Sequence, residues 1–212
     1  MVDVWRADLT AASDGLGELL CAEEHERARR LPSERDRRLW IRSRGVLRAL
    51  LARYLGSDPR ALRFAVGAHG KPMLERLGSN PTGVSLCFNL SHSGELALYA
   101  VSAKRSVGID VEVARGRKID ELAIAARVLG PAQARRLAGL AKGARTREFM
   151  RAWVANEAAV KCRGAGLGFA RPSQGPPTTE LWTVELDVGP RAAAAVTVEG
   201  GRCELRCWEW RG

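Results

Sequence analysis

Residues 106–113 read SVGIDVEV. Valine or isoleucine occupies every odd position and a small or acidic residue every even one, which is the alternation of a strand that packs one face against a core. Asp110 and Glu112 then project side by side from the other face. Two neighbouring carboxylates repel each other, and a divalent cation is a usual way to offset that repulsion. An exposed strand with ordinary alternating charge explains the same pattern equally well.

Strands are also predicted on the N-terminal side of this stretch. Residues 84–91 (VSLCFNLS) alternate, and residues 95–102 (ELALYAVS) follow across a turn at Ser93 and Gly94, which predicts a hairpin. A short strand is expected at residues 62–66. Before these strands, residues 33–55 show the clearest helical spacing, with Ser33 suited to cap the helix and Gly56 to end it.

The order of elements predicts an α+β protein made of two similar halves. Helices are expected at residues 16–30, 33–55, 118–128, 131–142 and 146–163, and further strands at residues 181–188, 193–198 and 203–210. Helices are followed by strands twice, with a boundary near residue 105. We therefore expect a pseudo-two-fold duplicate, with one α+β half at residues 1–105 and the other at residues 106–212.

Composition excludes several classes of protein. The chain has 212 residues, and no apolar run approaches the ~20 residues that span a bilayer. The first residues, MVDVWRADLTAASDG, do not resemble a signal peptide, so we expect a cytoplasmic protein without a membrane segment. The cysteines are odd in number and form no CxxC pair, which predicts free, buried thiols rather than zinc ligands or disulfides. They are Cys21, Cys87, Cys162, Cys203 and Cys207.

The net charge of +10 is concentrated in one segment. Between Arg27 and Arg63 the chain has twelve arginines and three acidic residues. A basic segment of this kind attracts a polyanion, which could be nucleic acid, an anionic cofactor or an acidic protein. A solvated helical face accounts for the same charges about as well.

A second pair of charged residues lies in the helix expected at residues 146–163. Glu157 and Lys161 are four residues apart and so share one face of that helix. They fall beside the apolar stripe that Phe149 and Trp153 define, and a half-buried acid and base in that position suggest a cleft. Taken alone, an ordinary surface ion pair is the better explanation.

The segment FNLSHSG at residues 88–94 places Ser91 and His92 where a strand meets a turn. Small hydroxyls and an imidazole suit phosphate binding there, although a single histidine is more often structural. Lys71 lies in a short basic turn, Gly70-Lys71-Pro72, which is a weak signal by itself. The sequence contains neither a Walker loop nor a GxGxxG motif.

In combination, these motifs resemble the 4′-phosphopantetheinyl transferases of the surfactin-synthetase-activating type. The resemblance runs from about residue 24 to residue 168, and the order and spacing of its motifs make it specific. The motifs are Gly70-Lys71-Pro72, Asn89-Leu90-Ser91-His92-Ser93, Gly108-Ile109-Asp110-Val111-Glu112, and Trp153 to Lys161 followed by Gly164-Ala165-Gly166-Leu167. One departure is Asn156, which stands where the family usually has lysine and which helical spacing places in the centre of the apolar stripe.

The resemblance implies an Mg²⁺-dependent monomer with its active site between the two halves. The following residue roles are those that the resemblance implies. The implied metal ligands are Asp110, Glu112 and Glu157. The implied phosphate contacts are Lys71, Ser91, His92 and Lys161, with Arg44 and Arg27 at the 3′-phosphate of coenzyme A. Glu157, Lys161 and His92 are the implied catalytic residues.

The implied reaction is attack of a carrier-protein serine on the β-phosphorus of the coenzyme A pyrophosphate, with release of 3′,5′-ADP. Three carboxylates and a metal would stabilise the developing charge, and Glu157 would accept the serine proton. The arginine-rich segment would then attract coenzyme A and an acidic apo carrier protein. The rival hypothesis is a non-enzymatic nucleic-acid-binding protein that uses the Arg27–Arg63 segment, but this leaves the carboxylates unexplained.

Overall fold

The computed structural model describes residues 1–67, 70–75, 86–114, 119–164 and 180–212. These residues form helices and strands in a mixed order, as the sequence predicts. The elements are β1 (Val2–Asp8), η1 (Asp14–Leu19), α1 (Ala22–Arg29), α2 (Glu34–Leu55), η2 (Pro59–Ala61), β2 (Phe64–Val66), β3 (Pro72–Leu74), β4 (Cys87–Ser93), β5 (Leu96–Ser102), β6 (Val107–Val113), α3 (Glu121–Val128), α4 (Pro131–Ala138), α5 (Lys142–Arg163), β7 (Leu181–Leu186), β8 (Ala192–Glu199) and β9 (Leu205–Glu209).

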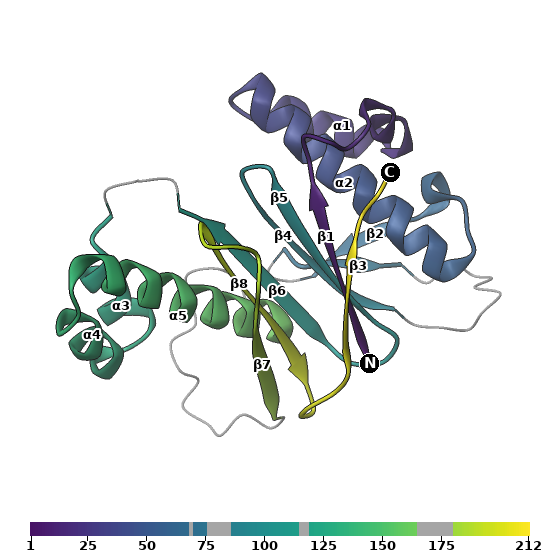
Figure 1. The fold of residues 1–212 in the computed structure, drawn as a ribbon. Coiled ribbons are helices and arrows are strands. Elements are labelled where there is room, and N and C mark those ends of the chain that lie inside the picture. Colours follow the sequence, from purple (N-terminus) through teal and green to yellow (C-terminus); the bar gives the residue numbers. More distant parts are fainter. Residues whose placement is uncertain (68–69, 76–85, 115–118, 165–179) are drawn as a thin grey trace.

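Two sheets form the centre of the molecule. A four-stranded sheet has the order β4-β5-β1-β9, and a three-stranded sheet has the order β6-β8-β7. Helices α1 and α2 lie over the first sheet and α5 runs along the second, with α3 and α4 at its outer end (Figure 1). β4 and β6 are therefore edge strands of different sheets, and they lie next to each other.

The alternation of the strands explains how these layers hold together. Ala97, Tyr99 and Val101 of β5 pack with the buried leucines of α2. The intervening residues of β5 instead pack against the odd-numbered residues of β6, including Val107 and Ile109. Strand β5 is thus buried on both faces, by α2 on one side and by the three-stranded sheet on the other, whereas β9 at the edge of its sheet is largely exposed.

Local signals in the sequence predicted several elements correctly. The Ser33 hydroxyl accepts a hydrogen bond from the Asp36 N–H at the start of α2. Gly56 ends the helix with a φ of 61°, a left-handed conformation that suits glycine. The predicted hairpin is formed by β4 and β5, which pair in antiparallel register around Gly94.

Other elements differ from the sequence-based predictions. The predicted helix at residues 16–30 is split into η1 and α1, and β1 and β3 were missed. β1 pairs in parallel with β9, so the C-terminal strand joins the sheet of the N-terminal residues. This pairing joins residues about 200 positions apart in the chain, from Val2 with Leu205 to Arg6 with Glu209, which no local pattern reveals.

Two further predictions concern burial and membranes. All five cysteines are free, as predicted, but Cys207 is exposed and only Cys162 is fully buried. None of the helices in the described ranges is long and apolar enough to cross a bilayer. The pseudo-two-fold duplication and the division at residue 105 stay predictions.

Candidate active site

Asp110 and Glu112 lie on the face of β6 that looks toward α5. The sequence left open whether this face is an exposed polar side or a cation site, and in the structure α5 covers it. Gly108 makes the close approach possible, because a Cβ atom there would lie 2.0 Å from the carbonyl oxygen of Ala158. Asp110 is consequently only 5% exposed. A carboxylate buried to this degree needs charged or hydrogen-bonding partners.

Lys161 of α5 supplies the main partner of Asp110. Its ammonium nitrogen lies 2.6 Å from Asp110 Oδ1 and 3.1 Å from the hydroxyl oxygen of Ser91. Ser91 in turn donates to the same Asp110 oxygen at 2.8 Å. Residues from β4, β6 and α5 therefore meet at one point, and the sequence-based hypothesis of an ordinary surface pair between Glu157 and Lys161 is wrong.

Glu157 lies deeper than the sequence suggested. It is 5% exposed, on the packed face of α5 beside Ala158, rather than half-buried at its edge. Burial raises the pKa of Glu157, the negative charges of Asp110 and Glu112 raise it further, and Lys161 partly opposes them. Asn156, expected in the centre of the apolar stripe, is instead partly exposed.

Two buried carboxylate oxygens, Oδ2 of Asp110 and Oε2 of Glu157, have no hydrogen-bond partner. Such atoms are rare in proteins, and a bound cation would satisfy them. In the described part of the chain, however, no three acidic, histidine or cysteine side chains converge closely enough to hold a metal. Asp110 is turned to Lys161 and Ser91, and Glu112 to Ser93. Mg²⁺ usually takes only one or two carboxylates and completes its shell with water and substrate phosphates, so the residues fit this ion.

Asn89 and Ser93 belong to the site as well, although the sequence analysis gave them no role. Asn89 Oδ1 accepts a hydrogen bond from the Ile109 N–H at 2.8 Å. The Ser93 hydroxyl donates to Glu112 Oε2 at 2.9 Å. The alternation of β4 was the available signal, because it places both residues on the same face as Ser91.

His92 lies on the opposite face of β4 from Ser91 and is exposed. It lines a groove of about 1780 Å³, together with Glu112 of β6 and Trp153 of α5. The groove is also bordered by Arg35 and Trp40 of α2, so residues from both sheets' helices contribute to it. His92 and Ser91 are thus adjacent in sequence but face different surroundings.

Lys71 lies outside the Asp110 cluster in the described contacts. Its ammonium group donates to the carbonyl oxygen of Val107 at 2.9 Å and to that of Cys162 at 3.3 Å. Burial lowers the pKa of Lys71. The side chain therefore ties the loop before β3 to the start of β6 and the last turn of α5, and its predicted phosphate contact stays a prediction.

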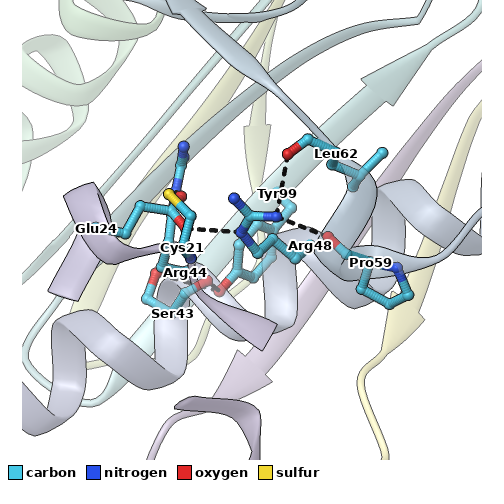
Figure 2. Close-up of polar contacts among 8 residues, drawn as sticks. All are labelled: Cys21, Glu24, Ser43, Arg44, Arg48, Pro59, Leu62 and Tyr99. Atoms are coloured by element: carbon cyan, nitrogen blue, oxygen red, sulfur yellow. Dashed lines mark hydrogen bonds and ion pairs between the residues drawn. The ribbon is translucent and has the colours of Figure 1, made fainter. Parts of the chain in front are cut away.

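Arg44 is also engaged within the protein. Figure 2 shows Arg44 and Arg48 of α2 close to Glu24 of α1, with a dashed line between Arg48 and Glu24. Arg44 donates to Glu24 Oε1, and Arg48 donates to Oε2 at 2.7 Å. Arg48 also donates to the carbonyl oxygens of Pro59 and Leu62 at 2.7 Å and 3.2 Å. The Arg44 side chain is 13% exposed and already has an internal partner, and its predicted contact with the 3′-phosphate stays a prediction.

Arg27 is placed differently. It is exposed, and its guanidinium lies 5.9 Å from the ring centroid of Trp40, a residue of the groove. Arg27 therefore lies next to one wall of the groove. The arginines of the basic segment do not form one free surface, since Arg44 and Arg48 are buried with Glu24 and Arg42 pairs with Asp14.

Comparison with known proteins identifies the family. Residues 106–208 match the 4′-phosphopantetheinyl transferase superfamily, and residues 5–104 match the 4′-phosphopantetheinyl transferase N-terminal family. The 4′-phosphopantetheinyl transferase HetI of a Nostoc species is 32% identical over 99% of this chain and 92% of its own length.

Two eukaryotic relatives are similar over a smaller share of their length. A phosphopantetheinyl transferase of a Thraustochytrium species is 31% identical over 69% of this chain and 53% of its own. The human L-aminoadipate-semialdehyde dehydrogenase-phosphopantetheinyl transferase is 29% identical over 79% of this chain and 52% of its own. Both family matches and the near-complete overlap with HetI lead to one conclusion: the chain belongs to the 4′-phosphopantetheinyl transferase superfamily and is an enzyme of that class.

Proposed function

We propose that this enzyme transfers the 4′-phosphopantetheine arm of coenzyme A to a serine of an apo carrier protein and releases 3′,5′-ADP. The observation that carries the proposal is the convergence of Asp110, Glu157 and Lys161 beside a groove, in a chain whose two parts both match this family. The nucleic-acid alternative has no comparable support, because it leaves this buried cluster unexplained.

Asp110, Glu157 and Glu112 are the residues that would hold Mg²⁺. The two buried oxygens of Asp110 and Glu157 that lack partners support this assignment. When bound, the ion would supply positive charge against the pyrophosphate of coenzyme A. Phosphate oxygens and water would complete its shell.

The protein's own residues support proton transfer and charge stabilisation. We assign the serine proton to Glu157, because it is a buried carboxylate of this cluster with one oxygen that has no hydrogen-bond partner. Lys161 holds its ammonium group beside Asp110, where it would stabilise negative charge on the departing phosphate. His92 would contact the ligand from the groove side of β4.

The finer features of the proposal come from the family resemblance. We assign the chain to the surfactin-synthetase-activating type and expect a monomer of two pseudo-equivalent halves, 1–105 and 106–212, with the active site between them. The groove supports this location, since elements of both halves line it. Arg27 would contact the 3′-phosphate of coenzyme A, the carrier would be acidic, and the enzyme would work in the cytoplasm.

The test is direct. The protein is incubated with coenzyme A, Mg²⁺ and separate apo carrier proteins from fatty-acid, polyketide and nonribosomal-peptide synthesis, and each carrier is weighed by mass spectrometry. We expect one or more carriers to gain the mass of one phosphopantetheine group, and the gain to disappear when the acceptor serine is replaced by alanine or EDTA is added. No mass gain on any carrier would refute the proposed function, and transfer in the presence of EDTA would refute its metal dependence.

A further inference from the structure

The edge strands β4 and β6 are joined by side chains. They belong to different sheets, and the backbone ladders of the described residues pair β4 with β5 and β6 with β8. An unpaired edge leaves backbone N–H and C=O groups without partners, and a buried group of that kind is costly. The contact between β4 and β6 therefore needs another source of hydrogen bonds.

Polar side chains of β4 provide that source. Asn89 Oδ1 accepts from the Ile109 N–H at 2.8 Å, and Ser93 Oγ accepts from the Val113 N–H at 3.1 Å. The two β4 residues are four apart, and so are the two β6 residues. The strands therefore run side by side in a single register. Side-chain oxygens of β4 maintain this register by accepting the N–H groups that backbone carbonyls would accept in a normal sheet. We call this contact the β4–β6 seam. Asn89 and Ser93 are each only 4% exposed.

Ser93 has a second contact in the seam. The same hydroxyl that accepts from the Val113 N–H donates its proton to Glu112 Oε2 at 2.9 Å. The backbone thereby orients the hydroxyl, and the hydroxyl orients the carboxylate. Ser91 likewise donates to Asp110 at 2.8 Å, but its hydroxyl accepts from Lys161 rather than from a backbone N–H. Hydroxyl groups of β4 thus contact both carboxylates of β6.

We propose that Ser93 is a positioning residue for the Glu112 carboxylate, and that Asn89 holds the register in which Ser93 and Glu112 meet. The inference rests on the proposed function, because Glu112 is there one of the residues that hold Mg²⁺. Hydrogen-bond partners of metal ligands fix the direction of the ligand, and their loss typically weakens metal binding about ten- to a hundredfold. Ser93 acts through Glu112 and needs no contact with coenzyme A or the carrier.

The test uses Ser93→Ala in the full chain with Mn²⁺ as the metal probe. Mn²⁺ binding is measured with coenzyme A present by the relaxation enhancement of water protons, which reports ions held on the slowly tumbling protein. We expect the Mn²⁺ dissociation constant to rise about tenfold or more. The Mg²⁺ concentration for half-maximal transfer should rise in parallel, while the KM for the carrier stays unchanged. Ser93→Thr retains a hydroxyl and should restore binding.

Ser102→Ala is the matched control. Ser102 of β5 is as buried as Ser93, and its hydroxyl also accepts a hydrogen bond from a backbone N–H, that of Arg105. Ser102 lies at the end of the β4–β5 ladder that is farthest from Ser93. It should leave Mn²⁺ binding unchanged. Thermal unfolding of each variant establishes that it is folded, and if Ser93→Ala does not fold, Ser93→Cys and Asn89→Ala take its place.

The outcomes distinguish a failure of the positioning role of Ser93 from a failure of the proposed metal site. Unchanged Mn²⁺ binding in a folded Ser93 variant, or an equal loss in Ser102→Ala, overturns the positioning role and leaves the proposed function standing. A wild-type protein that binds no Mn²⁺ in the presence of coenzyme A overturns the metal site and, with it, this inference. A loss confined to the Ser93 and Asn89 variants supports the inference.

Discussion

Replacing Gly108 by alanine tests how the site is assembled. The added Cβ atom would lie 2.0 Å from the Ala158 carbonyl oxygen and 2.3 Å from the Cys162 backbone nitrogen. Both atoms belong to the backbone of α5, so no flexible side chain can move aside. An ordinary van der Waals contact begins near 3.4 Å, so the helix would have to retreat from β6 by about 1.4 Å at this point.

The expected losses of rate and stability follow from the residues that move with the helix. Glu157 and Lys161 directly precede Ala158 and Cys162, so both move away from Asp110 when the helix moves. The Lys161–Asp110 distance of 2.6 Å would grow beyond hydrogen-bonding range. Displacement of a catalytic group by ~1 Å can cost about 10²-fold in rate, and overpacking of a core costs about 1–3 kcal/mol or more in stability. We expect Gly108→Ala to lose both transfer activity and stability.

Gly143→Ala provides the control in the same helix. A Cβ atom there would meet only the Arg147 guanidinium, at 3.9 Å, so the free energy of unfolding should stay equal or rise. Transfer rates by mass spectrometry and thermal unfolding are measured for both variants. Near-wild-type kcat and stability in Gly108→Ala would refute the conclusion that the close contact between α5 and β6 sets the site.

Three further predictions follow from the buried charges. Glu157→Gln keeps the packing but removes the proposed base, so kcat should fall by at least ~10²-fold; Lys161→Ala should also slow transfer, and rates of the double variant should show that the two losses do not add. Burial raises the pKa of Glu24, but Arg44, the Cys21 N–H and Arg48 together more than offset this and leave it below the usual glutamate value. The stability that Glu24 contributes should be present above that usual value and disappear as the pH falls through the lowered pKa. Melting temperatures of wild type and Glu24→Gln should therefore converge only in acid, and a constant difference at every pH would contradict this. Arg44→Ala should lower stability, because it removes one of the two arginines that hold Glu24, and a change confined to the KM for coenzyme A would instead favour the phosphate contact that the sequence predicted.

Local patterns in the sequence were enough to predict much of the secondary structure. Ser33 and Gly56 bound α2 because a capping hydroxyl and a left-handed glycine act within one turn of the chain. The alternation in residues 106–113 predicted β6, since side chains of a strand point to opposite faces whatever surrounds it. β1 was missed because its decisive partners, β5 and β9, are distant in the chain.

The motifs likewise identified the family and drew attention to Asp110, Glu157 and Lys161. Their chemistry, however, depends on what lies opposite each side chain. Tertiary packing buries Glu157 and raises its pKa, directs Lys161 to Asp110, and pairs Arg44 with Glu24. Residue types and spacing therefore determined which groups are available to this enzyme. Burial, charge pairing and the β4–β6 seam arise only where distant segments meet, and they decided how those groups are held.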